Sequence, residues 1–436
     1  MDIIYIHTHD VGRYIEPYGY NVPTPCLVEF ARDSTIFRNA YCAGPTCSPS
    51  RAAMLSGMYP HSNGMIGLAH LNFVMNDYKQ HLSFYLKDNG YHTVLCGEQH
   101  EAKNVDSLSY IEYLSKDTKG SADEKDVINA QSAAMYVEAF PKDKKLFLSF
   151  GMLCTHRPFV KKGDVSPEMV RVPAPLPDTY TIRQDYAHYI NGAKIMDRCV
   201  GIVLDALKKS GRYDSSLVFF TTDHGIAFPL MKCNLTDAGT GVSLIMKAPG
   251  KKGEKTVGKS VDSLVSHVDV FPTICEYAGV KIPEYVQGRS LVGIMEGKTD
   301  EVNTEIFAET TYHAAYEPMR AIRTKRYKLI KLYDPDTTVV PCNIDASASK
   351  DEMFGFGLNE VKRDDEMLFD LMLDPNEKAN LINSEAHQEI KDDLLSRLQA
   401  FMVKTNDPIL KGVRPYVEGA KVMKRHSRPA DMDWEE

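Results

Sequence analysis

The fold class is indicated most clearly by the stretch Leu217-Val218-Phe219-Phe220-Thr221-Thr222-Asp223-His224-Gly225. It is a short apolar run that ends in polar residues. An apolar run of this length without alternation is typical of a strand buried on both faces. Four more runs share this form, at residues 3–6, 93–95, 146–150 and 242–246. Together they predict a sheet that helices cover on both faces.

A strong helical pattern lies between two of these runs. Its apolar stripe extends over residues 190–207, and the pattern ends at Lys208-Lys209-Ser210-Gly211, with cations in the last turn and then a glycine. Strands that alternate with helices in this way form βαβ units. We therefore expect an α/β fold with a mostly parallel sheet between helices.

The sequence pattern changes near residue 300. Residues 327–333 alternate in part, as in an antiparallel strand, and residues 385–404 have the pattern of an amphipathic closing helix. Residues 334–362 show weak patterning and are predicted to form a long loop. We therefore divide the chain into a catalytic domain, residues 1–300, and a smaller C-terminal α+β subdomain, residues 301–436.

The composition argues against several classes of protein. A net charge of -8 over 436 residues is not that of a general nucleic-acid binder. Nine cysteines, an odd number, do not form the pattern of a disulfide framework. No segment approaches the roughly 20 apolar residues of a membrane-spanning helix, and no secretory signal opens the sequence. We expect no nucleic-acid or membrane partner and a cytoplasmic protein, or a periplasmic one if a signal was removed.

Polar segments follow four of the apolar runs, at residues 7–10, 97–100, 154–157 and 222–225. The carboxyl ends of parallel strands meet at one edge of a sheet, and ligands of α/β proteins bind there. One such ending would mean little, but four that converge on one edge predict a functional site.

The most specific motif is Cys47-Ser48-Pro49-Ser50-Arg51-Ala52-Ala53-Met54-Leu55-Ser56-Gly57. Pro49 suits the first turn of a helix, which places Cys47 at a helix N-terminus. Free N–H groups and the positive end of the helix dipole favour an anion there. Arg51 lies one turn further and can face the same side. The alternative is a buried, inert cysteine, and the length of the pattern argues against it.

This motif resembles the sulfatase signature, Cys-x-Pro-Ser-Arg followed by Leu-(Ser/Thr)-Gly, at each defined position. The resemblance implies an alkaline-phosphatase-like fold and a nucleophile made from Cys47. A formylglycine-generating enzyme or an anaerobic sulfatase-maturating enzyme would oxidise this cysteine to formylglycine. Other segments are similar to the heparan N-sulfatase (N-sulfoglucosamine sulfohydrolase) branch of the family. These segments are residues 60–68, 223–229, 317–323, 368–371, 374–381 and 405–408.

The resemblance also implies roles for individual residues. One divalent cation would be held by Asp10, Cys47, Asp223 and His224, with His9 beside them. The reaction would use Cys47, Arg51, His100 as a base, and His156 and Lys232 at the leaving group. His61 and Arg157 would shape the pocket wall. Glu309, His313 and Arg320 would bind a carboxylate or amine of a sugar, or else form a surface salt-bridge cluster.

Three positions depart from the family pattern. The family has two adjacent aspartates where this chain has His9-Asp10, and it often has Asn where this chain has His224. The resemblance implies Ca²⁺, yet imidazole suits Zn²⁺ or Mn²⁺ better. Either these histidines stand off the metal, or the metal is not calcium. Glu98 occupies the place of a lysine that contacts sulfate in many sulfatases, and it would repel sulfate unless it points away or a cation intervenes.

Three functional hypotheses follow. The first is a formylglycine-dependent sulfohydrolase acting on a sulfated sugar, with N-sulfoglucosamine of heparan or heparin preferred and O-sulfated sugars or aryl esters next. Hydrated formylglycine offers one hydroxyl to attack sulfur and a second to be deprotonated as sulfate leaves. The second is a formylglycine-dependent phosphonate or phosphodiester hydrolase. The third is an inactive protein that binds anionic saccharides, against which the intact motif argues.

Overall fold

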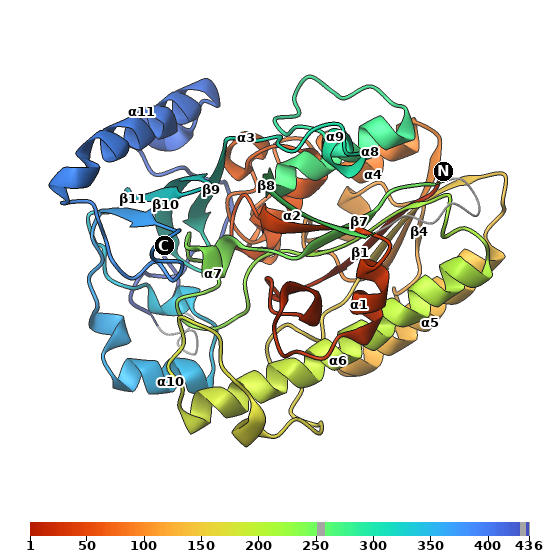
Figure 1. Ribbon diagram of the computed structural model, residues 1–436, viewed down its shortest axis with the longest axis horizontal. Coiled ribbons are helices and arrows are strands. Elements are labelled where there is room, and N and C mark those ends of the chain that lie inside the picture. The colour runs from red at the N-terminus through yellow and green to blue at the C-terminus, as the bar shows by residue number, and fades with distance from the viewer. Residues whose placement is uncertain (251–257, 428–432, 436) are drawn as a thin grey trace.

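The computed structural model of the chain, drawn in Figure 1, describes residues 1–250, 258–427 and 433–435. Within these residues the strands form one sheet of eight strands and one of four. The larger sheet has the order β4-β3-β5-β1-β6-β7-β2-β8. Its strands are Ile3–Thr8 (β1), Thr35–Tyr41 (β2), Tyr91–Gly97 (β3), Glu112–Tyr113 (β4), Lys145–Gly151 (β5), Leu217–Thr222 (β6), Leu244–Lys247 (β7) and Lys259–Ser266 (β8).

Most strand pairs of this sheet are parallel, as the sequence predicts. The strand β1 lies between β5 and β6 and is parallel to both, so three carboxyl ends meet at one edge. The strand β7 departs from the expected pattern, because it is antiparallel to β6 and β2. The connection from β6 to β7 carries the short helix α7 (Asp237–Thr240).

The α-helices of the described residues vary from single turns to the long α6. Their bounds are Pro25–Ala31 (α1), Cys47–Ser56 (α2), Pro60–Asn63 (α3), Leu82–Asp88 (α4), Ala122–Ala139 (α5), Tyr180–Lys209 (α6), Asp237–Thr240 (α7), Val270–Ala278 (α8), Val292–Met295 (α9), Ala348–Gly355 (α10) and Gln388–Lys404 (α11). The helix α6 confirms the helical pattern of residues 190–207 and ends with Lys208 and Lys209 in its last turn.

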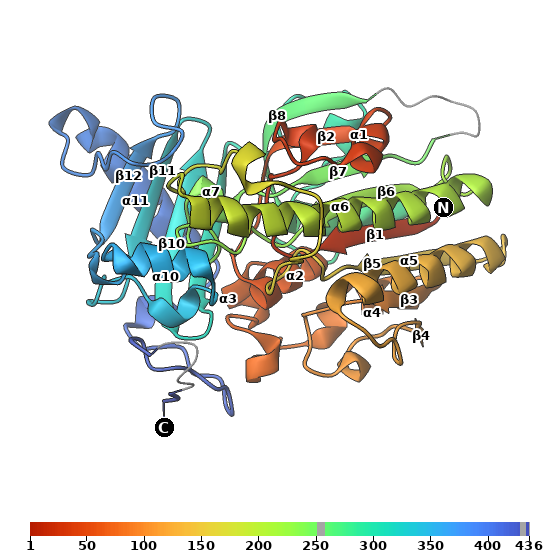
Figure 2. The same ribbon diagram turned by 90° about the horizontal axis from the view of Figure 1, so that it is seen from below.

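Helices cover both faces of the larger sheet, as Figures 1 and 2 show. On one face, residues of α1, α5 and α6 share a hydrophobic core with Ile4 and Ile6 of β1. On the other face, residues of α2, α4 and α8 share a core with Ile3 and Tyr5. Successive side chains of a strand point to opposite faces, so β1 contributes to both cores. This double burial explains its unbroken apolar sequence.

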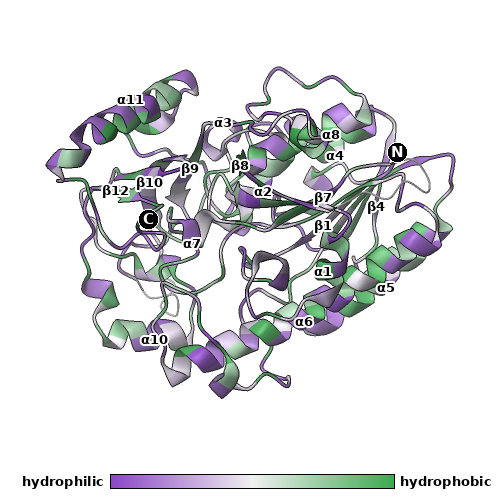
Figure 3. Cartoon of the chain, viewed as in Figure 1, coloured by the Kyte–Doolittle hydropathy of each residue, from purple (hydrophilic) through white to green (hydrophobic). Residues whose placement is uncertain are grey.

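The smaller sheet is antiparallel and has the order β12-β11-β10-β9. Its strands are Glu305–Tyr312 (β9), Tyr316–Thr324 (β10), Tyr327–Leu332 (β11) and Glu366–Asp370 (β12). The helix α11 packs on this sheet through Leu394 and Leu398, and hydrophobic and hydrophilic residues mix along it (Figure 3). The predicted strand and closing helix are confirmed as β11 and α11. The domain boundary placed at residue 300 lies between α9 and β9, and the division itself stays a prediction.

Two further expectations meet the structure here. Residues 334–362 are more than a loop, because they contain α10 and a 3-10 helix, Pro341–Asn343 (η7). The nine cysteines are all free in the described part of the chain, and eight are buried. No helix in this part is long and apolar enough to cross a membrane.

Candidate active site

Cys47 is the first residue of α2, as the sequence predicts. Thr46 before it has extended backbone, Pro49 lies in the first turn, and the helix ends at Gly57, whose φ of 68° is left-handed. The side chain is buried, and the residue is 2% exposed. Burial raises the pKa of the Cys47 thiol, and the nearby charge of Lys232 opposes this only in part. The unmodified thiol is therefore protonated and a poor nucleophile.

Three predicted metal-binding residues converge on this thiol. The Sγ atom of Cys47 lies 3.3 Å from Nε2 of His224. The same nitrogen lies 3.4 Å from Oδ1 of Asp10 and 3.7 Å from Oδ1 of Asp223. Nδ1 of His224 donates a 2.9 Å hydrogen bond to the carbonyl of Gly225. In the neutral ring, Nε2 therefore directs its lone pair toward the other three residues.

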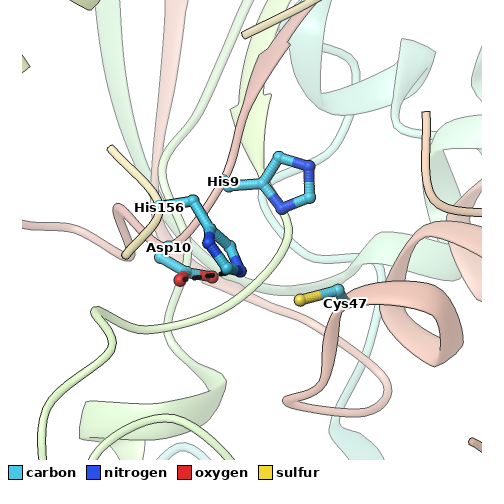
Figure 4. A group of neighbouring side chains, drawn as sticks. All are labelled: His9, Asp10, Cys47 and His156. Atoms are coloured by element: carbon cyan, nitrogen blue, oxygen red, sulfur yellow. Dashed lines mark ion pairs between the residues drawn. The ribbon is translucent and has the colours of Figure 1, made fainter. Parts of the chain in front are cut away.

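The arrangement fits a divalent cation. Asp10, Cys47, Asp223 and His224 each place a possible ligand atom within 4.8 Å of the others. Oδ1 of Asp10 is buried and accepts no hydrogen bond from the described residues, and a cation would satisfy it. His9, Asp10, Cys47 and His156 form a second such group, shown in Figure 4. The mixture of carboxylate and imidazole matches Zn²⁺ or Mn²⁺ better than Ca²⁺.

The turn after β1 orients these ligands. Asp10 has a φ of 52°, a left-handed conformation that is uncommon outside glycine. Its amide donates a 2.8 Å hydrogen bond to Oδ1 of Asp223. Nδ1 of His9 lies 3.1 Å from Oδ2 of Asp223. The hydroxyl of Thr155, in the segment after β5, donates to the carbonyl of His9. The left-handed turn is therefore held by contacts from the segments that follow β5 and β6.

Arg51 is buried one turn after Cys47 and fixes Asp223. Its guanidinium donates to Nδ1 of His7 at 2.7 Å, to the carbonyl of Thr8 at 2.8 Å and to Oδ2 of Asp223 at 3.1 Å. Burial opposes the charge of Asp223, but His224 and Arg51 hold the pKa of this carboxyl well below its usual range. The ion pair keeps Asp223 ionised beside the thiol.

His156 and Lys232 approach the same centre from two sides. Nε2 of His156 lies 3.8 Å from Oδ2 of Asp10, and the side chain is 26% exposed (Figure 4). Nδ1 of His156 donates to the carbonyl of Arg157, which leaves Nε2 directed into the site. Nζ of Lys232 lies 3.2 Å from the same oxygen of Asp10. Both residues therefore stand beside Asp10, and their roles at the leaving group stay a prediction.

The ring of His100 packs edge to face against that of His9, and the two centroids lie 4.8 Å apart. Its Nδ1 is buried and has no hydrogen-bond partner among the described residues. Burial, followed by the charge of Arg51, lowers the pKa of His100 to about 3. The ring is therefore neutral at physiological pH, and its Nδ1 is unpaired.

Two residues of the site had no sequence signal. Oδ2 of Asp345 lies 3.0 Å from Nζ of Lys232, and it comes from the segment predicted as a loop. The exposed His70 has its ring centroid 6.0 Å from that of His100. Neither residue belongs to a motif or follows a strand, so only the packing of distant segments places them here.

The comparisons with known proteins agree with this geometry. A family model described as "Sulfatase" matches residues 2–280, more than half of the chain. The chain belongs to the sulfatase family. Members of this family hydrolyse sulfate esters or sulfamates, so the chain is an enzyme of this class. A model described as "N-sulphoglucosamine sulphohydrolase, C-terminal" matches residues 232–346, a range that begins at Lys232 and includes Asp345.

Two curated relatives cover most of this sulfatase. It is 26% identical to N-sulphoglucosamine sulphohydrolase of Homo sapiens, over 90% of this chain and 88% of the relative. It is also 26% identical to an ulvan-active sulfatase of Formosa agariphila, over 93% of this chain and 75% of the relative. The human relative and the C-terminal family model support the similarity to the N-sulfatase branch that the sequence motifs indicate, whereas the second relative supports the sulfatase family alone.

Solved structures confirm the expected alkaline-phosphatase-like fold of the sulfatase. One, in complex with D-glucosamine-2-N,6-O-disulfate, has a TM-score of 0.70 and 18% identity over 93% of this chain and 98% of that chain. A phosphonate monoester hydrolase from Silicibacter pomeroyi has a TM-score of 0.73 and 18% identity over 98% of this chain and 100% of that chain. Identities this low establish a shared fold and nothing about substrate.

Three residues predicted to contact substrate lie together in the interior of the sulfatase instead of at its surface. Glu309 accepts hydrogen bonds from the amide and from Nδ1 of His61. Arg320 makes a two-point ion pair with Asp407, at 2.5 and 2.9 Å. All four side chains are buried. The alternative of a surface salt-bridge cluster is therefore wrong, and the network is interior and pairs its charges internally.

The remaining predicted residues divide between structure and site. Arg157 makes a two-point ion pair with Asp185 at 2.9 and 2.7 Å, and its guanidinium stacks 4.1 Å from the ring of Phe159. These contacts fix its side chain, and its role in the pocket wall stays a prediction. His313 is buried near Lys232 and Asp345, and burial, followed by the charge of Lys232, lowers its pKa to about 3.

Glu98 follows β3 beside the site. Its amide donates to the carbonyl of Gly151. Burial raises the pKa of its carboxyl, and the charges of Lys125 and then Arg51 oppose this rise. Lys125 belongs to α5, so a cation from outside the catalytic cluster acts on Glu98. This compensates part of the repulsion that Glu98 would exert on sulfate.

Proposed function

We propose that this sulfatase is a formylglycine-dependent sulfohydrolase of sulfated sugars and that its preferred substrate is N-sulfoglucosamine of heparan or heparin. The observation that carries the proposal is the Cys47 thiol at the start of α2, 3.3 Å from His224 and enclosed by Asp10 and Asp223. The human N-sulphoglucosamine sulphohydrolase and the matching C-terminal family model support the choice of sugar.

Asp10, Asp223 and His224 would hold one divalent cation, with His9 or His156 as a further ligand. A bound cation would withdraw charge from the sulfate and favour attack on sulfur. Ca²⁺ is the ion that the family resemblance implies, whereas the imidazoles of this chain favour Zn²⁺ or Mn²⁺. Elemental analysis of the purified protein would identify the ion.

The protein groups around position 47 have separable tasks. Formylglycine there would supply two hydroxyl groups, which a thiol or a serine cannot. Arg51 keeps Asp223 ionised and in place. His156 has a partly exposed ring with Nε2 beside Asp10 and would donate a proton to the leaving nitrogen or oxygen, with the charge of Lys232 beside it. His100 has an unpaired ring nitrogen and would accept the proton of the second hydroxyl.

A formylglycine-dependent phosphonate or phosphodiester hydrolase is the second candidate. The observation that favours it is the number of imidazoles around Asp10, and a solved phosphonate monoester hydrolase has the same fold. An O-sulfatase of sugars or aryl esters would use the same groups on a different substrate. An inactive saccharide-binding protein is disfavoured because the nucleophile position, the cation ligands and the proton-transfer residues are assembled together.

Mass spectrometry across Cys47, combined with a sulfate-release assay on N-sulfoglucosamine, tests the proposal. The protein should be produced together with a formylglycine-generating enzyme. We expect formylglycine at position 47, sulfate release, and no release by Cys47→Ala. The matched control is Cys199→Ala, which changes a buried cysteine of α6 and should retain activity.

The other outcomes discriminate among the candidates. Formylglycine with turnover of a phosphodiester and of no sulfated sugar would replace the proposal with the second candidate. Turnover of O-sulfated sugars alone would keep the enzyme among the sulfatases and change its proposed substrate to an O-sulfated sugar. An unmodified cysteine after co-production would contradict the proposed nucleophile.

A further inference from the structure

Asp345 belongs to the C-terminal part of the chain, yet it reaches the active site. It lies between η7 and α10, and both flanking segments are held firmly. The side chain of Asn343 accepts hydrogen bonds from the amides of Ala314 and Ala315, at 3.0 and 2.9 Å. Nζ of Lys350 donates to the carbonyls of Pro341 and Ile344, at 2.7 and 2.8 Å. The backbone that carries Asp345 is therefore fixed before any substrate arrives.

Asp345 forms a charged set with Lys232 and Asp10, in which the ammonium group of Lys232 contacts both carboxylates. Oδ2 of Asp10 lies 3.2 Å from Nζ of Lys232, and Oδ2 of Asp345 lies 3.0 Å from the same nitrogen. The side chains of Asp10 and Lys232 are 0% and 4% exposed, whereas that of Asp345 is 23% exposed. Of these three side chains, that of Asp345 is thus the most exposed, although its Oδ2 atom, which faces Lys232, is itself buried.

A carboxylate at this position needs a reason. Asp345 is not among the groups that could share a cation with Cys47. An acidic group beside a sulfate site repels the substrate unless it faces a hydrogen-bond donor. Charge-assisted hydrogen bonds to a carboxylate are about twice as strong as neutral ones. A sugar offers hydroxyl donors, and cleavage of an S–N bond frees an amine that becomes an ammonium. An aryl leaving group offers neither.

We infer that Asp345 determines specificity by accepting a hydrogen bond from an ammonium or hydroxyl group on the sugar that carries the sulfate. The inference rests on the proposed function, because it assumes that the leaving group is a sugar. His313 lies buried beside Lys232 and Asp345. Asp345 thus supplies recognition from the C-terminal part of the chain.

The competing explanation is that Asp345 only holds Lys232. In that case its removal would disturb every substrate equally, since Lys232 stands beside the cation ligands. Recognition of the sugar predicts instead a loss that depends on the leaving group. The comparison of a sugar with para-nitrophenyl sulfate, an aryl ester without donors beside the ester, therefore separates the two explanations.

The experiment measures kcat/KM of the formylglycine-containing enzyme and of Asp345→Asn on both substrates. Asparagine keeps the size of the side chain and can still accept from Lys232, but it lacks the charge. We expect the ratio of kcat/KM for N-sulfoglucosamine to that for the aryl ester to fall roughly tenfold to hundredfold. Asp345→Glu should recover part of the ratio. The matched control is Asp351→Asn, an exposed carboxylate of α10, which should leave the ratio unchanged.

An equal loss on both substrates would overturn the inference and leave Asp345 as a holder of Lys232. A second measurement needs no turnover: calorimetric titration of glucosamine into Cys47→Ser, with and without Asp345→Asn. We expect the second change to weaken binding at least about tenfold, and equal affinities would also overturn the inference. A wild-type enzyme that cleaves the aryl ester but no sulfated sugar would contradict the proposed function, whatever Asp345 does.

Discussion

Two buried clusters of this sulfatase have almost the same composition. Both combine histidine, carboxylates and an arginine, and both place possible metal ligands within 4.8 Å of one another. One is the catalytic cluster of Asp10, Cys47, Asp223, His224 and Arg51. The other is the interior cluster of His61, Glu309, Arg320 and Asp407. The sequence alone assigned members of both to the active site.

The two clusters differ in how their carboxylate oxygens are paired. In the interior cluster all four oxygens of Glu309 and Asp407 accept hydrogen bonds, from His61, Arg320 and a backbone amide. In the catalytic cluster Oδ1 of Asp10 has no donor among the described residues, and Asp10 has left-handed backbone. Composition therefore does not distinguish a site from a structural ion network, whereas an unpaired, strained ligand does.

The largest difference should appear in catalysis. Cys47→Ala is expected to reduce sulfate release by on the order of 10⁴-fold or more, because the nucleophile is lost. Glu309→Gln changes the interior cluster and should retain activity within about tenfold. Steady-state assays on a sulfated sugar, with formylglycine content measured for each preparation, provide the comparison. Equal losses in both variants would show that the interior cluster also takes part in the reaction.

The second difference should appear in stability. Asp407→Ala leaves the guanidinium of Arg320 buried without its ion pair, and we expect the free energy of unfolding to fall by about 3–5 kcal/mol. Asp10→Ala should cost less, because Lys232 keeps Asp345 as a partner and the strained turn relaxes. Urea unfolding of both variants without added metal measures this. The expected order would be refuted by a larger loss in Asp10→Ala.

Asp126, a buried carboxylate outside both clusters, shows the effect of burial without a neighbouring arginine. Asp126 of α5 accepts from the amides of Leu153 and Cys154, and burial raises its pKa to about 6. The unfolded chain loses this proton near the ordinary value of 3.8. Between these values the unfolded state binds fewer protons, so the free energy of unfolding falls as the pH rises, by at most about 3 kcal/mol, and then levels off.

Asp126→Asn removes this titration. Its free energy of unfolding should depend less on pH between about 4 and 6 than that of the wild type, as urea unfolding at several pH values would show. Asp123→Asn, on the same helix, is the control. Parallel pH profiles for wild type and Asp126→Asn would contradict the assignment.

The smallest effect concerns the cation. A divalent ion at ten times its dissociation constant should stabilise the wild type by about 1.4 kcal/mol, because it binds the folded state. Thermal unfolding after chelation and re-addition of Zn²⁺, Mn²⁺ or Ca²⁺ measures the shift. Asp10→Ala should lose the shift and Glu309→Gln should keep it. Loss of the shift in Glu309→Gln alone would place the ion in the interior cluster.

The sequence predicts the centre of the fold better than its edges. The strands β1, β5 and β6 are buried on both faces, so their sequences are unbroken apolar runs. The edge strand β8 is half exposed along its first residues, and β4 has two residues, so neither produces such a run. The antiparallel direction of β7 is a property of its pairing with β6 and β2, which periodicity does not report.

Some residues of the active site were likewise easier to predict from the sequence than others. Asp10, His156 and Asp223 were predictable because they follow strands whose ends must meet. Asp345 reaches Lys232 through the packing of the C-terminal segment, and no local pattern carries that information. Glu309 and Arg320 were assigned to substrate by resemblance, but exposure is a tertiary property, and the structure encloses both.

Helix α2 is buried along its whole length, from Cys47 to Ser56. If Cys47 is oxidised as we propose, the oxidising enzyme would not reach this buried segment in the native protein and would have to act before the chain folds. The yield of competent enzyme would then be set by two competing rates, that of oxidation and that of helix α2 closing into the core. A chain that folds before oxidation would be well packed and would pass ordinary tests of folding, but it would stay inactive until it unfolded again.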